Sequence, residues 1–230
     1  MKTLHQLELD DNVRCVVLTG AGDHFMAGGD VRQMHDYISS HEGKEIQRYF
    51  LHRIHDLHPI MFSMRRMQKP IVAKVRGAAA GAGVFLASVC DLVIAEEDFF
   101  TLAYCHIGTT PDGPSSFYLP RAIGIKRTLE MTLLGDRYTA RQMSDMGLVN
   151  FVVAPGDLEQ ESDNLVQRLA HGPTHVYGMA KKLMYRSLEN EFESQLQLES
   201  ECFADCAGRD DYREGVAAFV EKRKASFTGK

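Results

Sequence analysis

Apolar residues in the first hundred positions follow two patterns, which alternate along the chain. Runs of consecutive apolar and β-branched residues predict buried strands at residues 13–19, 69–75 and 91–95. Apolar residues spaced three and four apart predict a helix that begins near Val31 and a longer one over residues 42–68. We expect a kink near His58, because a proline follows it inside the longer helix. The first half of the chain is therefore predicted to consist of strand–helix repeats.

The next part of the chain carries clear helix-ending signals. Gly135 and Gly147 each follow an apolar helical segment, and Thr139 is placed to cap the second of these helices. Short strands are expected at residues 99–102 and 150–153. The β/α alternation therefore continues to about residue 155.

The last third of the chain has helical periodicity throughout. Amphipathic stripes predict four helices, at roughly 156–170, 174–190, 193–207 and 210–225. A helical tail of this kind packs on its own core or on a neighbouring subunit. We therefore expect two parts, a core over residues 1–155 and a helical region over residues 156–230.

Two segments of small residues each lie between a strand and a helix. One is Phe25–Asp30, in which Asp30 is placed to cap the next helix, and the other is Gly77–Gly83, which contains only glycine and alanine. Such a loop presents unpaired N–H groups at the positive end of a helix, which suits an anion or an oxyanion. Close packing of a helix on a strand requires the same small residues. Together, the two loops would place two N–H groups around one oxygen.

Composition narrows the classes of function. The chain has 230 residues, a net charge of −5 and 25% charged residues, which is typical of a globular protein and argues against nucleic acid as the main partner. Its five cysteines form no CxxC pair, and its histidines lack a metal-ligand spacing with carboxylates, so no metal is expected. The sequence shows no signal peptide and no membrane-spanning run, so we expect a cytoplasmic protein without membrane contact.

Several motifs, in order along the whole chain, resemble those of the crotonase superfamily, also called the enoyl-CoA hydratase/isomerase superfamily. The matching segments are Phe25–Asp30, Lys69–Gly83, Cys90–Ala95, Ile107–Gly124, Gly147–Val149 and Arg213–Arg223. The resemblance implies an α/β fold with a crotonase-like ββα spiral core and a C-terminal helical trimerisation region. We expect the strand and helix that usually precede residue 13 in this superfamily to be missing, since Met1–Leu9 resembles only the end of that helix. A homotrimer or a dimer of trimers is implied as well.

The resemblance also implies a site for an acyl-CoA thioester. By the motif match, the two N–H groups that hold the thioester oxygen fall on Gly29 and Ala82. The coenzyme A moiety, which is part of the substrate, would be the only cofactor-like group. Further residues implied to bind it or the acyl chain are Ala27, Gly28, Asp30, Val31, Phe85, Tyr104, His58, Phe219 and Lys222.

Departures from the hydratase pattern point to the reaction. Two glutamates activate water in enoyl-CoA hydratases, and their positions match Phe85 and Tyr104, neither of which is a carboxylate. Asp112 lies where the superfamily's enoyl-CoA isomerases carry their acid/base, and the surrounding sequence resembles the phenylacetate-pathway isomerases. We therefore expect an enoyl-CoA double-bond isomerase that uses Asp112 for a 1,3-proton shift. A helix N-cap ahead of Ser115 is the other interpretation of Asp112.

Three alternatives to the isomerase stay open. Enoyl-CoA hydratase is one. A hydrolase like 4-chlorobenzoyl-CoA dehalogenase is another, since His58 and Asp112 match its histidine and aspartate, with Tyr104 where it has tryptophan. An inactive, truncated member of the superfamily is the third.

Overall fold

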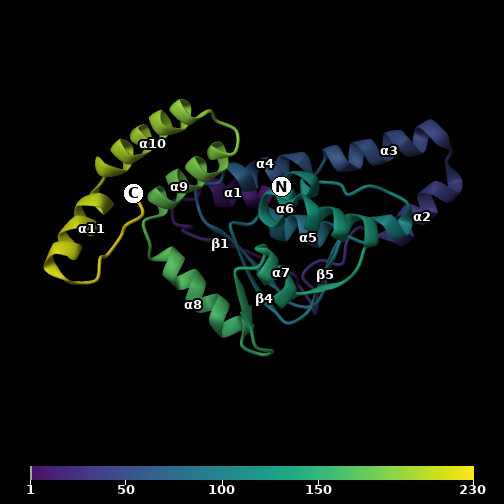
Figure 1. The fold of residues 1–230 in the computed structure, drawn as a ribbon, viewed down its shortest axis with the longest axis horizontal. Coiled ribbons are helices and arrows are strands. Elements are labelled where there is room, and N and C mark those ends of the chain that lie inside the picture. The colour runs from purple at the N-terminus through teal and green to yellow at the C-terminus, as the bar shows by residue number, and fades with distance from the viewer. Residues whose placement is uncertain (1) are drawn as a thin grey trace. The chain divides into compact units, whose positions relative to one another are not determined.

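The computed structural model describes residues 2–230 and has a mixed α/β fold (Figure 1). The chain forms two compact units, of which the first contains residues 17–65 and 72–162. The second contains residues 2–16, 66–71 and 163–230. The division at residue 155 that the sequence suggested stays a prediction.

Helices make up most of the chain. They are α1 Lys2–Leu9, α2 Val31–Ser40, α3 Gly43–His55, α4 His58–Arg66, α5 Ala82–Val89, α6 Ser115–Leu134, α7 Ala140–Met146, α8 Leu158–Ala170, α9 Thr174–Ser187, α10 Phe192–Ala207 and α11 Asp210–Glu221, with a 3-10 helix at Tyr104–Ile107. Among the described residues, no helix is both long and apolar enough to cross a membrane.

Short strands form two small sheets. The strands are β1 Val16–Thr19, β2 Ile71–Val75, β3 Ala79–Ala80, β4 Leu92–Glu96, β5 Phe99–Thr101, β6 Tyr138–Thr139 and β7 Phe151–Val153. One sheet has the order β1-β2-β4-β7, with β4 parallel to both β2 and β7. The other has the order β3-β5-β6, with β3 and β5 parallel. The central strands β2 and β4 are largely buried, and strands of this kind appear as continuous apolar runs in the sequence.

The apolar runs form the core of the first unit. Val72 and Ala73 of β2, Ala95 of β4 and Phe100 of β5 have no exposed surface. Helix α5 packs against β3 and α6. Because the helix that follows Gly77–Gly83 is buried in this core, its N-terminus has a fixed position relative to the sheets.

The prediction of a single kinked helix over residues 42–68 is wrong. The structure has two helices there, α3 and α4, separated at Asp56 and Leu57. The N–H of Asp56 bonds to the oxygen of His52 and ends α3, and Pro59 is the second residue of α4. Proline is tolerated in the first turn of a helix, where its missing N–H has no partner to lose, so the chain starts a new helix instead of bending an old one.

Predicted caps and the helical tail are confirmed. Asp30 accepts a hydrogen bond from the N–H of Gln33 at the start of α2, and Thr139 forms a reciprocal capping box with Gln142 at the start of α7. The four C-terminal helices are present, but α11 ends at Glu221, because Lys222 adopts a left-handed conformation with φ of 56°.

The second unit is held together by buried polar side chains. The Lys69 ammonium donates to the carbonyl oxygens of Leu7, Glu8 and Asp10, at 2.5, 3.1 and 2.6 Å, and so satisfies the C-terminal end of α1. Asp211 accepts hydrogen bonds from the backbone of Thr228 and Gly229, each at 2.7 Å, which fixes the C-terminal segment on α11. These contacts explain why a lysine and an aspartate are buried here.

Candidate functional site

The two small-residue loops, residues 25–30 and 77–83, lie side by side in the first unit, and we call them the oxyanion loops. Met26 and Ala79 form a parallel bridge between them. The N–H of Met26 donates to the oxygen of Ala78 at 3.1 Å, and the N–H of Ala80 donates to the oxygen of Met26 at 2.8 Å. The sequence suggested only that the two loops would act on the same oxygen. The structure shows that they are hydrogen-bonded to each other.

Glycine is required where the oxyanion loops touch. A Cβ on Gly83 would lie 2.4 Å from the carbonyl oxygen of Met26, which is too close for any side chain. Gly28 has φ of 103° and Gly81 has φ of 49°, a region that side-chain-bearing residues rarely adopt. Close packing and an oxyanion site were both predicted from these glycines, and the packing is confirmed.

The N–H groups of Gly29 and Ala82 are left without partners. Ala82 is the first residue of α5, and within residues 2–230 neither its N–H nor that of Gly29 makes a hydrogen bond. The N–H groups of Val84 and Phe85, by contrast, bond to the oxygen of Gly81. Ala82 therefore offers an available donor at the positive end of a buried helix, a position that stabilises a developing negative charge.

Asp112 is joined to this region through Tyr104. The Tyr104 hydroxyl donates to Oδ1 of Asp112 at 2.5 Å, within the range of a charge-assisted bond. The ring of Tyr104 also approaches Gly81 of the second oxyanion loop, at 3.7 Å from where a Cβ would lie. Asp112 does not cap the following helix, since Pro114 occupies the N-cap of α6 and no side chain caps it.

The environment keeps Tyr104 in its neutral form. Burial raises the pKa of Tyr104 far above its usual value, and the hydrogen bond to the Asp112 carboxylate raises it further. The phenol therefore acts as a permanent hydrogen-bond donor to Asp112. The sequence indicated mainly that Tyr104 replaces a glutamate, and it gave no sign that the Tyr104 hydroxyl donates a hydrogen bond to Asp112.

Phe85 supports the loop that carries Asp112. Its side chain is only 2% exposed, and a Cβ on Gly113 would lie 2.9 Å from its ring. Gly113 has φ of 57°, so this loop lies directly on the Phe85 ring. Phe85, which the resemblance matches to a hydratase glutamate, is thus a packing residue in this structure.

The remaining predicted residues of the first unit are more scattered. His58 is exposed on α4, with its ring 5.1 Å from that of His55 and 6.2 Å from that of Phe62. Among the described residues no hydrogen bond joins His58 to Asp112. Ala27 and Asp30 are exposed on the first oxyanion loop, and Val31, at the start of α2, is also exposed.

Phe219 and Lys222 belong to the second unit. Phe219 is 86% exposed near the end of α11, and Lys222 follows as the left-handed residue that ends this helix. Their predicted contact with coenzyme A stays a prediction.

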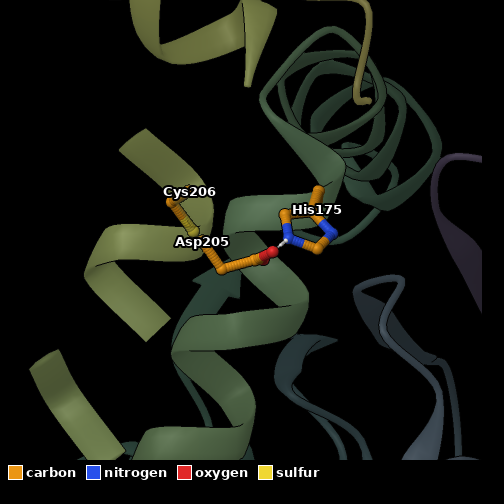
Figure 2. A group of neighbouring side chains, drawn as sticks. All are labelled: His175, Asp205 and Cys206. Atoms are coloured by element: carbon orange, nitrogen blue, oxygen red, sulfur yellow. Dashed lines mark hydrogen bonds and ion pairs between the residues drawn. The ribbon is translucent and has the colours of Figure 1, made fainter. Parts of the chain in front are cut away.

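A cluster of three potential metal ligands lies in the second unit (Figure 2). His175 on α9 faces Asp205 and Cys206 on α10, and the ligand atoms lie within 4.8 Å of one another. The sequence did not suggest this group because its members are thirty positions apart. His175 is hydrogen-bonded to Asp205, whose pKa is lowered by this bond and by a second one from Arg209. Burial raises the pKa of the Cys206 thiol, which disfavours the thiolate that binds metals.

Comparison with known proteins places these observations in a family. The family model described as enoyl-CoA hydratase/isomerase matches residues 1–230. The 1,2-epoxyphenylacetyl-CoA isomerase of Escherichia coli is 35% identical over 99% of this chain and 86% of that protein. The trans-2-decenoyl-[acyl-carrier-protein] isomerase of Streptococcus mutans is 32% identical over 100% of this chain and 86% of that protein.

Solved structures agree with the sequence comparisons. An enoyl-CoA hydratase from Polaromonas sp. JS666 superposes with a TM-score of 0.90 and 32% identity, over 98% of this chain and 86% of that one. The relatives carry isomerase, hydratase and dehalogenase names, so the family alone leaves the reaction undecided. The predicted α/β crotonase-like fold with its C-terminal helical region is confirmed, while the trimer and the missing N-terminal segment stay predictions. The chain belongs to the enoyl-CoA hydratase/isomerase family of the crotonase superfamily.

Proposed function

We propose that the protein is an enoyl-CoA isomerase that moves a double bond along an acyl-CoA chain. The observation that carries this proposal is Asp112, a carboxylate linked through Tyr104 to the loop that bears the available N–H of Ala82. A carboxylate next to oxyanion donors is what proton removal beside a thioester carbonyl requires.

In the proposed reaction, Asp112 moves one proton between two carbons. Asp112 removes a proton from C2 of a 3-enoyl thioester, and the electron pair moves onto the carbonyl oxygen to give a dienolate. The N–H groups of Gly29 and Ala82 hold this oxygen. Asp112 then returns the proton to C4, which gives the 2-enoyl thioester. No redox cofactor is needed, because the proton and the electron pair are both conserved.

Water addition is proposed to be slow. Phe85 and Tyr104 occupy the two positions at which a hydratase would carry glutamates. Phe85 is buried under Gly113, and Tyr104 is a hydrogen-bond donor rather than a base. The chain therefore supplies one carboxylate for proton transfer but no second one to activate water.

The test follows isomerisation and hydration of 3-enoyl and 2-enoyl thioesters in parallel. We expect Asp112→Asn to lower the isomerisation rate by about a thousandfold, within the range of general acid–base catalysis, while thioester binding stays nearly unchanged. Exposed Asp163 on α8 provides the matched control, Asp163→Asn, which should retain full activity. Undiminished turnover by Asp112→Asn would refute the proposal, and chloride release from 4-chlorobenzoyl-CoA would favour the dehalogenase.

We also propose that coenzyme A lies along residues Ala27 to Val31 and that the protein forms a homotrimer or a dimer of trimers. Support for assembly comes from exposed apolar side chains on the last two helices. They are Phe203, Tyr212, Val216, Phe219 and Val220, with exposed fractions from 41% to 86%. Apolar surface of this kind marks an interaction site. Phe219→Glu should shift the mass measured by light scattering toward the monomer, and an unchanged mass would argue against this surface.

A further inference from the structure

The two oxygens of the Asp112 carboxylate have different surroundings. Oδ1 accepts the 2.5 Å hydrogen bond from the Tyr104 hydroxyl. Oδ2 has no hydrogen-bond partner within residues 2–230. Asp112 is half-buried, so a carboxylate oxygen without a protein partner is available to a bound substrate.

Tyr104 is itself held in a fixed position. It begins a 3-10 helix that follows Ala103, a residue with φ of 48°, and its ring lies against Gly81. The C-terminal end of the same short helix is closed by the N–H of Gly108, which bonds to the oxygen of Cys105. The Tyr104 hydroxyl therefore comes from a rigid support next to the second oxyanion loop.

We infer that Tyr104 is a positioning residue that holds Oδ1 of Asp112, so that Oδ2 alone carries the proton between the two substrate carbons. This inference rests on the proposed isomerase function and specifies which atom performs it. A single bond to Oδ1 stops the carboxyl group from rotating about its Cβ–Cγ bond. The same oxygen that takes the proton from C2 is then the one that gives it to C4.

A held carboxyl group has a measurable consequence for the transferred proton. While Asp112 is protonated on Oδ2, rotation of the carboxyl group would turn that proton away from the dienolate and toward water. With Tyr104 bonded to Oδ1, the proton stays facing the dienolate and returns to it. The protein should therefore carry a substantial share of a deuterium label from C2 to C4 of the same molecule.

The experiment compares the full-length protein with Tyr104→Phe on a 3-enoyl-CoA deuterated at C2. For Tyr104→Phe we expect kcat to fall about tenfold, as for the loss of a hydrogen bond to a charged group, with KM nearly unchanged. The fraction of label found at C4 should fall as well, because the released carboxyl group exchanges its proton with water. A 3-fluorotyrosine at position 104 keeps the ring and the hydroxyl, and should restore label transfer.

A matched control separates this effect from the general loss of a buried hydroxyl. Tyr138 on β6 is 6% exposed and lies outside the oxyanion loops, so Tyr138→Phe should leave both kcat and label transfer unchanged. If Tyr104→Phe behaves like Tyr138→Phe, the positioning role of Tyr104 is wrong while the isomerase proposal stands. Wild-type isomerisation with no label reaching C4 would also overturn the inference. Absence of isomerisation in the wild type would instead overturn the proposed function.

Discussion

The two compact units of this protein treat their polar groups in opposite ways. In the first unit, the N–H groups of Gly29 and Ala82 and one oxygen of Asp112 have no hydrogen-bond partner among the described residues. In the second unit, Lys69 satisfies three carbonyl oxygens and Asp211 accepts from two backbone N–H groups. Gly29 is exposed and Ala82 and Asp112 are half-buried, so a ligand can reach these groups, whereas Lys69 and Asp211 are buried and already paired.

Apolar side chains also differ between the core beside the oxyanion loops and the last two helices. Phe85 and Phe100 of the first unit are at most 2% exposed, whereas Phe203 and Phe219 of the second are 66% and 86% exposed. The candidate site thus leaves hydrogen-bonding groups unpaired, and the last two helices leave apolar surface uncovered. These two differences agree with the proposed catalysis at the oxyanion loops and with the proposed association through the last two helices.

The largest effect is expected at the contact between the oxyanion loops. Gly83→Ala would place a Cβ 2.4 Å from the backbone oxygen of Met26, so the loops must separate. We expect about 3 kcal/mol of lost stability from this overpacking and a fall in activity of about a hundredfold from the displaced Ala82 N–H.

A matched substitution sharpens this test. In Gly29→Ala the added Cβ meets only the flexible end of the Met34 side chain, at 2.6 Å, and Met34 can move. Thermal melting and isomerase assays on both variants check the prediction. Equal losses of stability and activity in the two variants would show that the contact between the loops does not cause the losses in Gly83→Ala.

A second, smaller effect is expected in the other unit. Lys69→Met removes the donor to the carbonyl oxygens at the end of α1, and we expect a loss of about 2 kcal/mol, measured by denaturant unfolding. Exposed Lys44 on α3 gives the control variant Lys44→Met, which should leave stability unchanged. The catalytic rate of folded Lys69→Met should stay near the wild-type value. A large fall in kcat would contradict the proposal that the contacts of Lys69 stabilise the fold without affecting catalysis.

The third prediction concerns acid stability. The bidentate hydrogen bonds from Arg223, at 2.6 and 2.8 Å, lower the pKa of Glu214 to about 2 from its ordinary 4.5. Because the folded pKa is lowered, this pair stabilises the protein above pH 4.5, and the contribution is lost as the pH falls toward 2. Solvent screening of the exposed pair keeps the effect small. Glu214→Gln should therefore show a shallower loss of stability than the wild type between these two pH values.

The smallest effect is expected at the cluster of His175, Asp205 and Cys206. His175 and Asp205 are already hydrogen-bonded to each other, and the nearby Arg209 guanidinium opposes a cation, so added Zn²⁺ or EDTA should leave the melting temperature unchanged. Cys206→Ser should also change little. A rise in melting temperature with Zn²⁺ that Cys206→Ser abolishes would contradict this prediction and identify a metal site.

The sequence alone predicted the longer strands and most of the helices, because period and capping are local properties. Buried strands show as apolar runs, and Asp30 and Thr139 cap helices a few residues away. It also determined the family, since several motifs occur in order. The helix over residues 42–68 was predicted wrongly because proline breaks a helix interior but suits a helix start, and periodicity does not distinguish the two.

Only the tertiary structure decided how distant residues meet. The contact between Met26 and Ala79, the bond between Tyr104 and Asp112, and the group formed by His175 and Cys206 all depend on packing. Local sequence specifies which groups can donate or accept, but not which partner comes within 3 Å. The packing of the core determines these partners. The sequence suggested Tyr104 mainly as the replacement of a glutamate, and the structure shows that its hydroxyl donates a hydrogen bond to Asp112.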